Sequence, residues 1–171
     1  MSNEFDKEYE EYKQQGRIWG LLPKEKIKKL KFPRVKKEII DQFLEIEDLT
    51  TSVSDVLDSL GINGAIPSSY LFPVLPGKKI AGTAVTIRSI PERKTPTKSY
   101  ADKDFIKMAT RDLYYIAEPG DIVVADCGGN LDVSNMGGQS CTAAKSCGLV
   151  GAVVYGAVRD ISTIKKLDFS I

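Results

Sequence analysis

The stretch PGDIVVADCGGNLDVSNMGGQSCTAAKSCGLVGAVVYGAVRD, residues 119–160, decides the fold. Within it, DIVVAD (121–126) predicts a short buried strand, and SCTAAKSC (140–147) predicts a helix that Gly148 ends. LVGAVVYGAV (149–158) predicts another strand, which is too apolar to have one face in water. Because β and α elements alternate and the strands are apolar throughout, we expect an α/β domain with a largely parallel sheet.

Polar side chains follow the second of these strands, where Arg159 and Asp160 come directly after it. Functional groups of α/β sheets collect at such carboxyl ends. Two glycines precede the helix between the strands, and the first amides of that helix lack intrahelical acceptors. Such a helix end attracts a carboxylate or phosphate, an Arg can bind a carboxylate through two hydrogen bonds, and an Asp can ligate a hard cation. The residues of this candidate site are Gly137, Gly138, Gln139, Ser140, Arg159 and Asp160.

Each of these features also occurs in proteins that have no site there. A Gly-Gly pair before a helix is usually a tight turn, and an Arg-Asp pair after a strand is usually a surface ion pair. Their order and spacing are more informative: the twenty residues 139–158 lie between Gly138 and Arg159. The sequence therefore favours a site for a small carboxylate and a divalent cation, and it leaves a purely structural role open.

The rest of the chain predicts a helical extension over residues 1–45 and a main domain over residues 46–171. Aromatic side chains at i, i+4 and i+7 within residues 3–15 form one helical stripe, which is typical of a docking face. A second helix is expected over residues 35–46.

The segment KEKIKKLKFPRVKK (24–37), which runs into the start of this second helix, carries eight cationic side chains against one Glu. Such a cluster can contact nucleic acid or another anion, but no aromatic-rich RNA-binding motif accompanies it. We favour a solvated helix face with Ile27 and Leu30 turned inwards. The net charge of the chain is +1, which gives no general attraction to nucleic acid.

In the main domain, VSDVLDSLG (53–61) predicts a helix with Ser52 as its N-cap. KIAGTAVTIRSI (79–90) predicts a strand, ERKTPTKSYADK (92–103) a polar loop, and the apolar spacing over residues 105–116 a helix.

The composition excludes several kinds of chemistry. Histidine is absent, which removes Ser-His and Cys-His nucleophile pairs and imidazole metal ligands. Cys127, Cys141 and Cys147 lack CxxC spacing, so we expect reduced thiols and no zinc site. No run approaches the ~18 apolar residues of a membrane span, and the charged N-terminus lacks the apolar centre of a secretory signal. A cytoplasmic location is therefore expected.

The stretch over residues 119–160 resembles the core signature of the RraA-like family, and the likeness extends upstream through SDVLDSLG and PGKKIAGTAVTI to about residue 50. That family includes 4-hydroxy-4-methyl-2-oxoglutarate aldolases and the regulators of ribonuclease activity A. The resemblance implies a swivelling β/β/α fold, assembly into trimers or hexamers, and a Mg²⁺- or Mn²⁺-dependent lyase that acts on pyruvate-like 2-oxo acids. It further implies that Arg159 binds the oxo oxygen, that Asp160 anchors the metal, and that the amides of Gln139 and Ser140 hold the substrate carboxylate.

This chain departs from the aldolase pattern at two acidic positions. Gly138 stands where the aldolases carry Asp or Glu, and Thr163 stands where they carry an acid three residues after Asp160. Family members also continue with further strands beyond the position of Ile171, so we expect an incomplete sheet. Two hypotheses follow: a metal-dependent 2-oxo acid lyase, favoured by Asp160 and the glycine loop, and a non-catalytic regulatory or binding protein, favoured by the missing acids.

Overall fold

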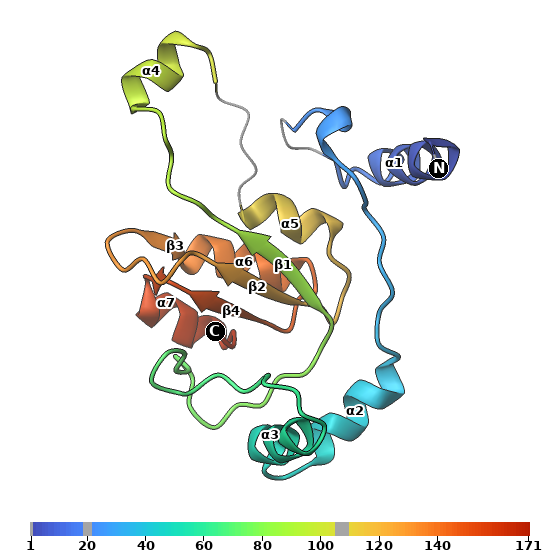
Figure 1. Cartoon of the computed structure of the whole chain (residues 1–171), viewed down its shortest axis with the longest axis vertical. Helices are drawn as coiled ribbons and strands as arrows, with labels where there is room; N and C mark the ends of the chain where they lie inside the picture. Colours follow the sequence, from blue (N-terminus) through green and yellow to red (C-terminus); the bar gives the residue numbers. More distant parts are fainter. Residues whose placement is uncertain (1, 19–21, 105–109) are drawn as a thin grey trace.

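A parallel sheet lies at the centre of the computed structural model, which describes residues 2–18, 22–104 and 110–171 (Figure 1). The strands pair in the order β1-β2-β4 and are β1 (Ala84–Arg88), β2 (Ile122–Asp126) and β4 (Gly151–Tyr155). Both pairings are parallel, so the carboxyl ends of the three strands meet at one edge of the sheet. The predicted α/β fold with a parallel sheet is confirmed.

Three helices cover one face of this sheet: α5 (Thr110–Ile116), α6 (Gly138–Ser146) and α7 (Ile161–Leu167) (Figure 1). Helix α6 lies between the other two and contacts both. Alternate strand residues are buried in one apolar cluster with side chains of these helices, because successive residues of a strand point to opposite faces. The cluster includes Val123, Ala125, Ala152 and Val154 from the strands and Tyr114, Cys141, Ala144 and Ile164 from the helices.

The predicted strand over residues 149–158 is interrupted at Gly156. Strand β4 ends at Tyr155, and β5 (Ala157–Val158) pairs in parallel with β3 (Ser134–Met136) in a separate two-stranded sheet. A methyl group at Gly156 would lie 2.9 Å from Cys127 Cβ and 2.9 Å from Asn135 Oδ1, so only glycine fits where the chain bends. The sequence predicted neither β3 nor this break, because both depend on contacts between distant segments.

Other elements differ from the prediction mainly in their bounds. The strand expected over residues 79–90 is only β1, and the expected polar loop contains α4 (Pro96–Ala101), whose N-cap Thr95 accepts the Lys98 N–H at 3.2 Å. The expected helix over residues 105–116 is α5, and its residues 105–109 lie outside those that the structure describes. No helix in the described ranges has both the length and the apolar character that a bilayer crossing requires.

The N-terminal segment contains the two predicted helices but not the predicted basic one. These two helices are α1 (Ser2–Gln14) and α2 (Lys37–Glu45), with one 3₁₀ turn at Lys24–Lys26, and α3 (Leu49–Ser59) follows them. The basic segment is otherwise not helical over residues 27–36, although Leu30 is buried as expected. The predicted N-cap Ser52 is wrong: α3 begins four residues earlier, and Ser52 N–H bonds to Asp48 O inside the helix.

Two arginines attach the N-terminal segment to the sheet and helices. Arg17 donates from Nε to Tyr115 O at 2.8 Å and from Nη2 to Ala117 O at 2.8 Å, which satisfies carbonyls at the end of α5. Arg34 donates to both carboxylate oxygens of Asp121, at the start of β2, over 3.0–3.2 Å. Asp121 is only 2% exposed, so this carboxylate is a buried charge that Arg34 neutralises.

The other edge of β4 pairs with the last residues of the chain. Ser170 forms a parallel bridge with Gly151, and Ala152 N–H donates to Ser170 O at 2.9 Å. Val74 N–H in turn donates to Ile171 O at 2.8 Å. The segment 170–171 is therefore held between β4 and the loop that contains Val74.

Candidate functional site

The predicted site residues lie where the N-termini of α6 and α7 meet. Gly137 is the N-cap residue of α6, and Asp160 is the N-cap residue of α7. Asp160 Oδ2 accepts the N–H of Gly138 at 3.0 Å, which joins the two helix ends. Arg159 is fixed beside them, because its N–H donates to Met136 O at 3.0 Å. The structure thus brings the glycine loop and the Arg-Asp pair together, as their spacing predicted.

The two glycines are needed for space rather than for an unusual backbone angle. Gly137 has an extended backbone with φ of −149°, which any residue can adopt. A methyl group there would lie 2.7 Å from Asp160 Oδ2 and 3.0 Å from Arg159 Cγ. A methyl group at Gly138 would lie 2.8 Å from Thr163 Cγ2. The glycines therefore let the turn at residues 159–160 pack against the start of α6.

The first amide of the predicted carboxylate cradle already has an acceptor within the protein. Gly138 N–H bonds to Asp160 Oδ2, and the first donor within helix α6 is Cys141 N–H, which bonds to Gly137 O at 2.9 Å. The amides of Gln139 and Ser140 lie between these two and remain the candidates for binding a ligand carboxylate.

Asp160 has a backbone conformation that few residues adopt. Its φ of 61° and ψ of 39° lie in the left-handed region, where Asn and Asp are the commonest residues after glycine. Its side chain is 45% exposed, and Oδ2 lies 3.8 Å from Nε of Arg159, whose side chain is 76% exposed. The Arg-Asp pair thus presents one guanidinium and one carboxylate to solvent, next to the N-terminus of α6.

The part of the chain that contains this site matches a known family. The family model described as "RraA-like: Aldolase/RraA" matches residues 50–171. The chain belongs to the RraA-like family. The matched range includes every residue of the candidate site. The resemblance of residues 119–160 to the RraA-like family is confirmed.

Relatives and solved structures agree with this assignment. A protein of Halalkalibacterium halodurans named "Putative 4-hydroxy-4-methyl-2-oxoglutarate aldolase" is 32% identical over 134 residues, which are 78% of this chain and 55% of that protein. Protein DlpA of Legionella pneumophila is 29% identical over 71% of this chain and 18% of its own length. Streptomyces coelicolor RraAS2, described as an unusual member of the RNase ES inhibitor RraA protein family, shares the fold with a TM-score of 0.67 at 23% identity.

An uncharacterized protein from Pseudomonas syringae has a TM-score of 0.61 at 26% identity, over 84% of this chain and 58% of that one. The likeness to RraAS2 covers 82% of this chain and 64% of RraAS2. The RraA-like chain therefore spans less than two thirds of the length of each of these four proteins.

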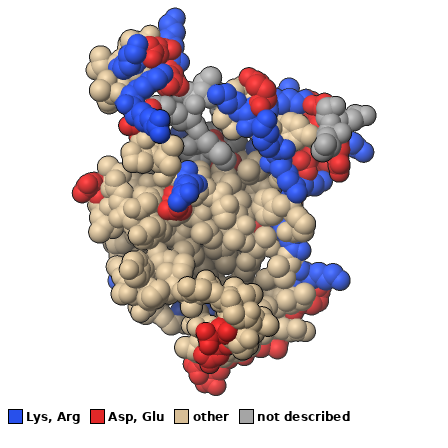
Figure 2. All heavy atoms as spheres, in the orientation of Figure 1, with Lys and Arg blue, Asp and Glu red and all other residues tan. Residues whose placement is uncertain are grey.

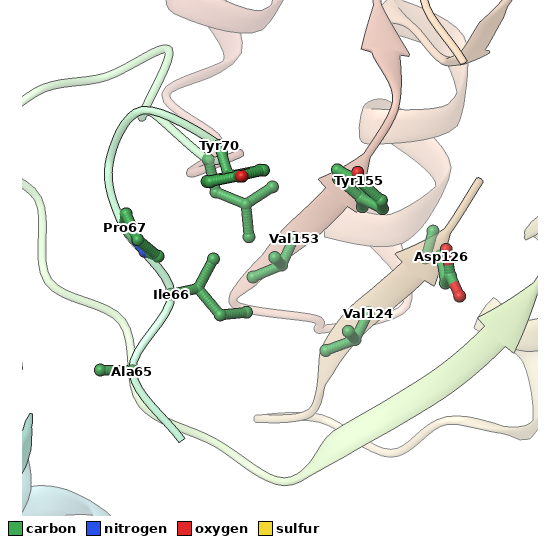
Figure 3. A pocket seen from close by; sticks show the side chains of 10 residues that line it. Ala65, Ile66, Pro67, Tyr70, Val124, Asp126, Val153 and Tyr155 are labelled. Atoms are coloured by element: carbon green, nitrogen blue, oxygen red, sulfur yellow. The ribbon is translucent and has the colours of Figure 1, made fainter. Parts of the chain in front are cut away.

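A pocket that no local sequence pattern indicated lies on the opposite face of the sheet. It measures about 450 Å³ and lies between the loop at residues 65–71 and the strand residues Val124 and Val153 (Figure 3). Figure 3 shows Ile66 and Tyr70 opposite the strands, with Tyr155 and Asp126 at the carboxyl ends of β4 and β2. Figure 2, in the orientation of Figure 1, shows a broad uncharged surface across the middle of the molecule. Most of the charged side chains in that figure lie above and below this surface. Arg159 and Asp160 do not line this pocket.

Burial, and after it the negative charge of Asp160, raise the pKa of the Cys141 thiol to about 11. This thiol is fully buried in α6, while a free thiol has a pKa of about 8.5. Its contribution to stability is complete below the unfolded-state pKa and is lost as the pH rises through the folded-state pKa, because only the unfolded state then releases the proton. We expect wild type to lose about 3 kcal/mol of unfolding free energy relative to Cys141→Ala between pH 8.5 and 11.

Urea unfolding of both proteins at intervals across this range measures the difference. Using the difference cancels the titration of lysines and of the other thiols, which both proteins share. Stability curves that stay parallel from pH 8 to 11 would contradict the raised thiol pKa.

Proposed function

We propose that this RraA-like chain is a divalent-metal-dependent lyase that cleaves a C–C bond of a 2-oxo acid, by oxaloacetate decarboxylation, by 4-hydroxy-4-methyl-2-oxoglutarate aldol cleavage, or by both. One observation carries the proposal: Arg159 and Asp160 lie beside the start of α6. The Gly138 N–H donates to Asp160 Oδ2, and Nε of Arg159 lies 3.8 Å from the same oxygen. The name of the Halalkalibacterium relative supports the aldolase class.

The donor set suits a cation that keeps most of its own waters. The described residues contain no group of three or more His, Cys, Asp or Glu side chains that could together hold a metal ion, and we propose Asp160 as the one protein ligand. Mg²⁺ is commonly bound through one or two carboxylates with waters and substrate oxygens in the remaining positions. Oδ2 of Asp160 is oriented by Gly138 N–H, which leaves Oδ1 as the atom for Mg²⁺ or Mn²⁺. A bound cation would supply the electrophile that stabilises negative charge on the oxo oxygen of the substrate.

The protein's own groups bind and orient the 2-oxo acid. The amides of Gln139 and Ser140 would donate hydrogen bonds to the substrate carboxylate at the N-terminus of α6, where partial positive charge favours an anion. The Arg159 guanidinium would donate to the oxo oxygen and stabilise the enolate that forms when the C–C bond breaks. In decarboxylation, the electron pair of the broken bond moves into this enolate, carbon dioxide leaves, and solvent protonates the carbon to give pyruvate.

Retro-aldol cleavage has one further requirement, for which neither residue 138 nor residue 163 supplies an acidic side chain. A proton must leave the hydroxyl of the substrate, and a positioned base usually contributes ~10²–10⁴ in rate. Gly138 carries no side chain, and the methyl group of Thr163 occupies the space beside it. We therefore expect decarboxylation of oxaloacetate to exceed aldol cleavage of 4-hydroxy-4-methyl-2-oxoglutarate by about 10²-fold or more.

Pyruvate release from both substrates, with and without Mg²⁺, tests this proposal in one coupled assay. Equal metal-dependent rates on the two substrates would show that another group supplies the base. A folded protein that releases no pyruvate from either substrate would favour the second candidate, a non-catalytic regulator, which the missing acids at residues 138 and 163 support. The trimeric or hexameric assembly and the cytoplasmic location stay predictions.

A further inference from the structure

We infer that Thr163 is a positioning residue for Asp160, and that it acts through its contact with Gly138. This inference rests on the proposed function for the metal-binding role of Asp160, but the contact itself does not. Thr163 lies in the first turn of α7, one turn after Asp160, and its N–H donates to Asp160 O at 2.9 Å. This hydrogen bond fixes the backbone of Thr163 relative to that of Asp160.

The contact between the two helices has a defined shape. A methyl group at Gly138 would lie 2.8 Å from Thr163 Cγ2, 3.1 Å from Thr163 Cβ and 3.4 Å from Asp160 Cβ. The Cγ2 methyl group thus occupies the space that the missing side chain of Gly138 leaves free. Packed contacts of this kind transmit displacements, because protein interiors have few voids. The contact sets how close the N-terminus of α7 lies to that of α6.

This spacing determines where the Asp160 carboxylate points. Oδ2 accepts Gly138 N–H at 3.0 Å, so the amide next to the contact is also the group that orients the carboxylate. Pushing α7 away from α6 lengthens this bond and turns Oδ1 from its position. Groups that orient a metal ligand typically contribute ~10–100-fold to metal affinity. We therefore expect the Gly138–Thr163 contact to control cation binding without touching the cation.

A double-mutant cycle tests the contact by moving one methyl group across it. Gly138→Ala adds a methyl group that collides with Thr163 Cγ2, and Thr163→Ser removes that Cγ2 atom. We expect Gly138→Ala to lower Tm by about 3–10 °C, because overpacking costs stability. We expect it also to weaken Mn²⁺ binding in the presence of oxalate ~10–100-fold, measured by electron paramagnetic resonance. The double variant should recover most of both losses.

Gly137→Ala is the matched control. The atoms nearest to its added methyl group would be Asp160 Oδ2, at 2.7 Å, and two side-chain atoms of Arg159, so Thr163→Ser should not rescue it. A second comparison leaves Gly138 unchanged and varies only residue 163. Thr163→Val keeps a methyl group at the contact, so its affinity for Mn²⁺–oxalate should lie within about twofold of that of wild type. Thr163→Ser lacks this methyl group and should bind several-fold more weakly.

The outcomes separate the contact from the function. A double variant with no higher Tm than Gly138→Ala would overturn the steric pair. Recovery of Tm without recovery of Mn²⁺–oxalate binding, or equal binding by Thr163→Ser and Thr163→Val, would overturn the positioning role. Failure of wild type to bind Mn²⁺–oxalate would refute the proposed function and the positioning role together, even if the Tm cycle still showed the steric pair.

Discussion

Asp160→Asn is expected to abolish metal-dependent pyruvate release while leaving the protein folded. Asparagine tolerates the left-handed backbone that Asp160 adopts, with φ of 61°. Its side-chain oxygen can still accept the Gly138 N–H that now bonds to Oδ2 at 3.0 Å. The substitution therefore removes the negative charge that a hard cation needs and keeps the geometry of the helix ends. Activity assays over a Mg²⁺ series and titration of Mn²⁺ measure the loss.

The other end of α7 supplies a matched control for this substitution. Asp168 also has a left-handed backbone, with φ of 55°, and its carboxylate forms a salt bridge with Lys78. A hydrogen bond from Lys78 lowers the pKa of Asp168, so this residue is charged at neutral pH. Asp168→Asn makes the same chemical change in the same conformation, away from Gly138. It should leave Mn²⁺ affinity unchanged, and equal losses in both variants would point to a general effect on α7 instead of a metal site.

Arg34→Ala is expected to cost about 3–5 kcal/mol of unfolding free energy, since it leaves the Asp121 carboxylate buried without its partner. The guanidinium donates to both oxygens of Asp121, contacts Glu118 Oε1 at 3.1 Å, and lies 4.5 Å from the ring centre of Phe32. Asp121 is 2% exposed, and Glu118 N–H also donates to it at 2.8 Å. Removing the arginine thus removes the attachment of the N-terminal segment at the start of β2, as urea unfolding should show.

Two further variants identify the cause of this loss. Asp121→Asn in the Arg34→Ala background removes the unpaired charge and keeps an acceptor for Glu118 N–H, so it should recover a large part of the stability. Lys37→Ala removes an exposed i,i+4 pair with Asp41 and should cost no more than about 0.5 kcal/mol. A loss below about 1 kcal/mol for Arg34→Ala would mean that the buried carboxylate finds water or another partner.

The sequence predicted those features that depend on local pattern. The apolar strands β2 and β4 and helix α6 were predicted from hydrophobic runs and Gly148, and the site residues from their place after those elements. The hydrogen bond between Gly138 and Asp160 could not be predicted, because it depends on how closely α7 packs against α6. The roles of Arg159 and Asp160 stay predictions until the activity and metal-binding measurements are made.

The features that were missed depend on contacts between distant residues. In the basic segment, no sequence pattern distinguished Arg34 from the seven lysines around it. Its salt bridge with the buried Asp121 forms only because the fold brings the two residues together. The bend at Gly156 depends on Cys127 and Asn135, which lie more than twenty residues away in the chain. Only α4 had a local signal that could have been used, since Thr95 followed by Pro96 is a typical start of a helix.

The sheet of this protein also determines how it should behave at high concentration. Ala152 N–H donates to Ser170 O, and because the N–H groups of a strand alternate between its two sides, the N–H of Val154 points to the same edge of β4. Beside it lies the pocket surface with Ile66, Tyr70 and Tyr155, which are 64%, 64% and 41% exposed. A strand edge next to exposed apolar side chains can pair with further chains. We therefore expect a charged residue in place of one of these exposed apolar side chains to raise the solubility of the protein at high concentration.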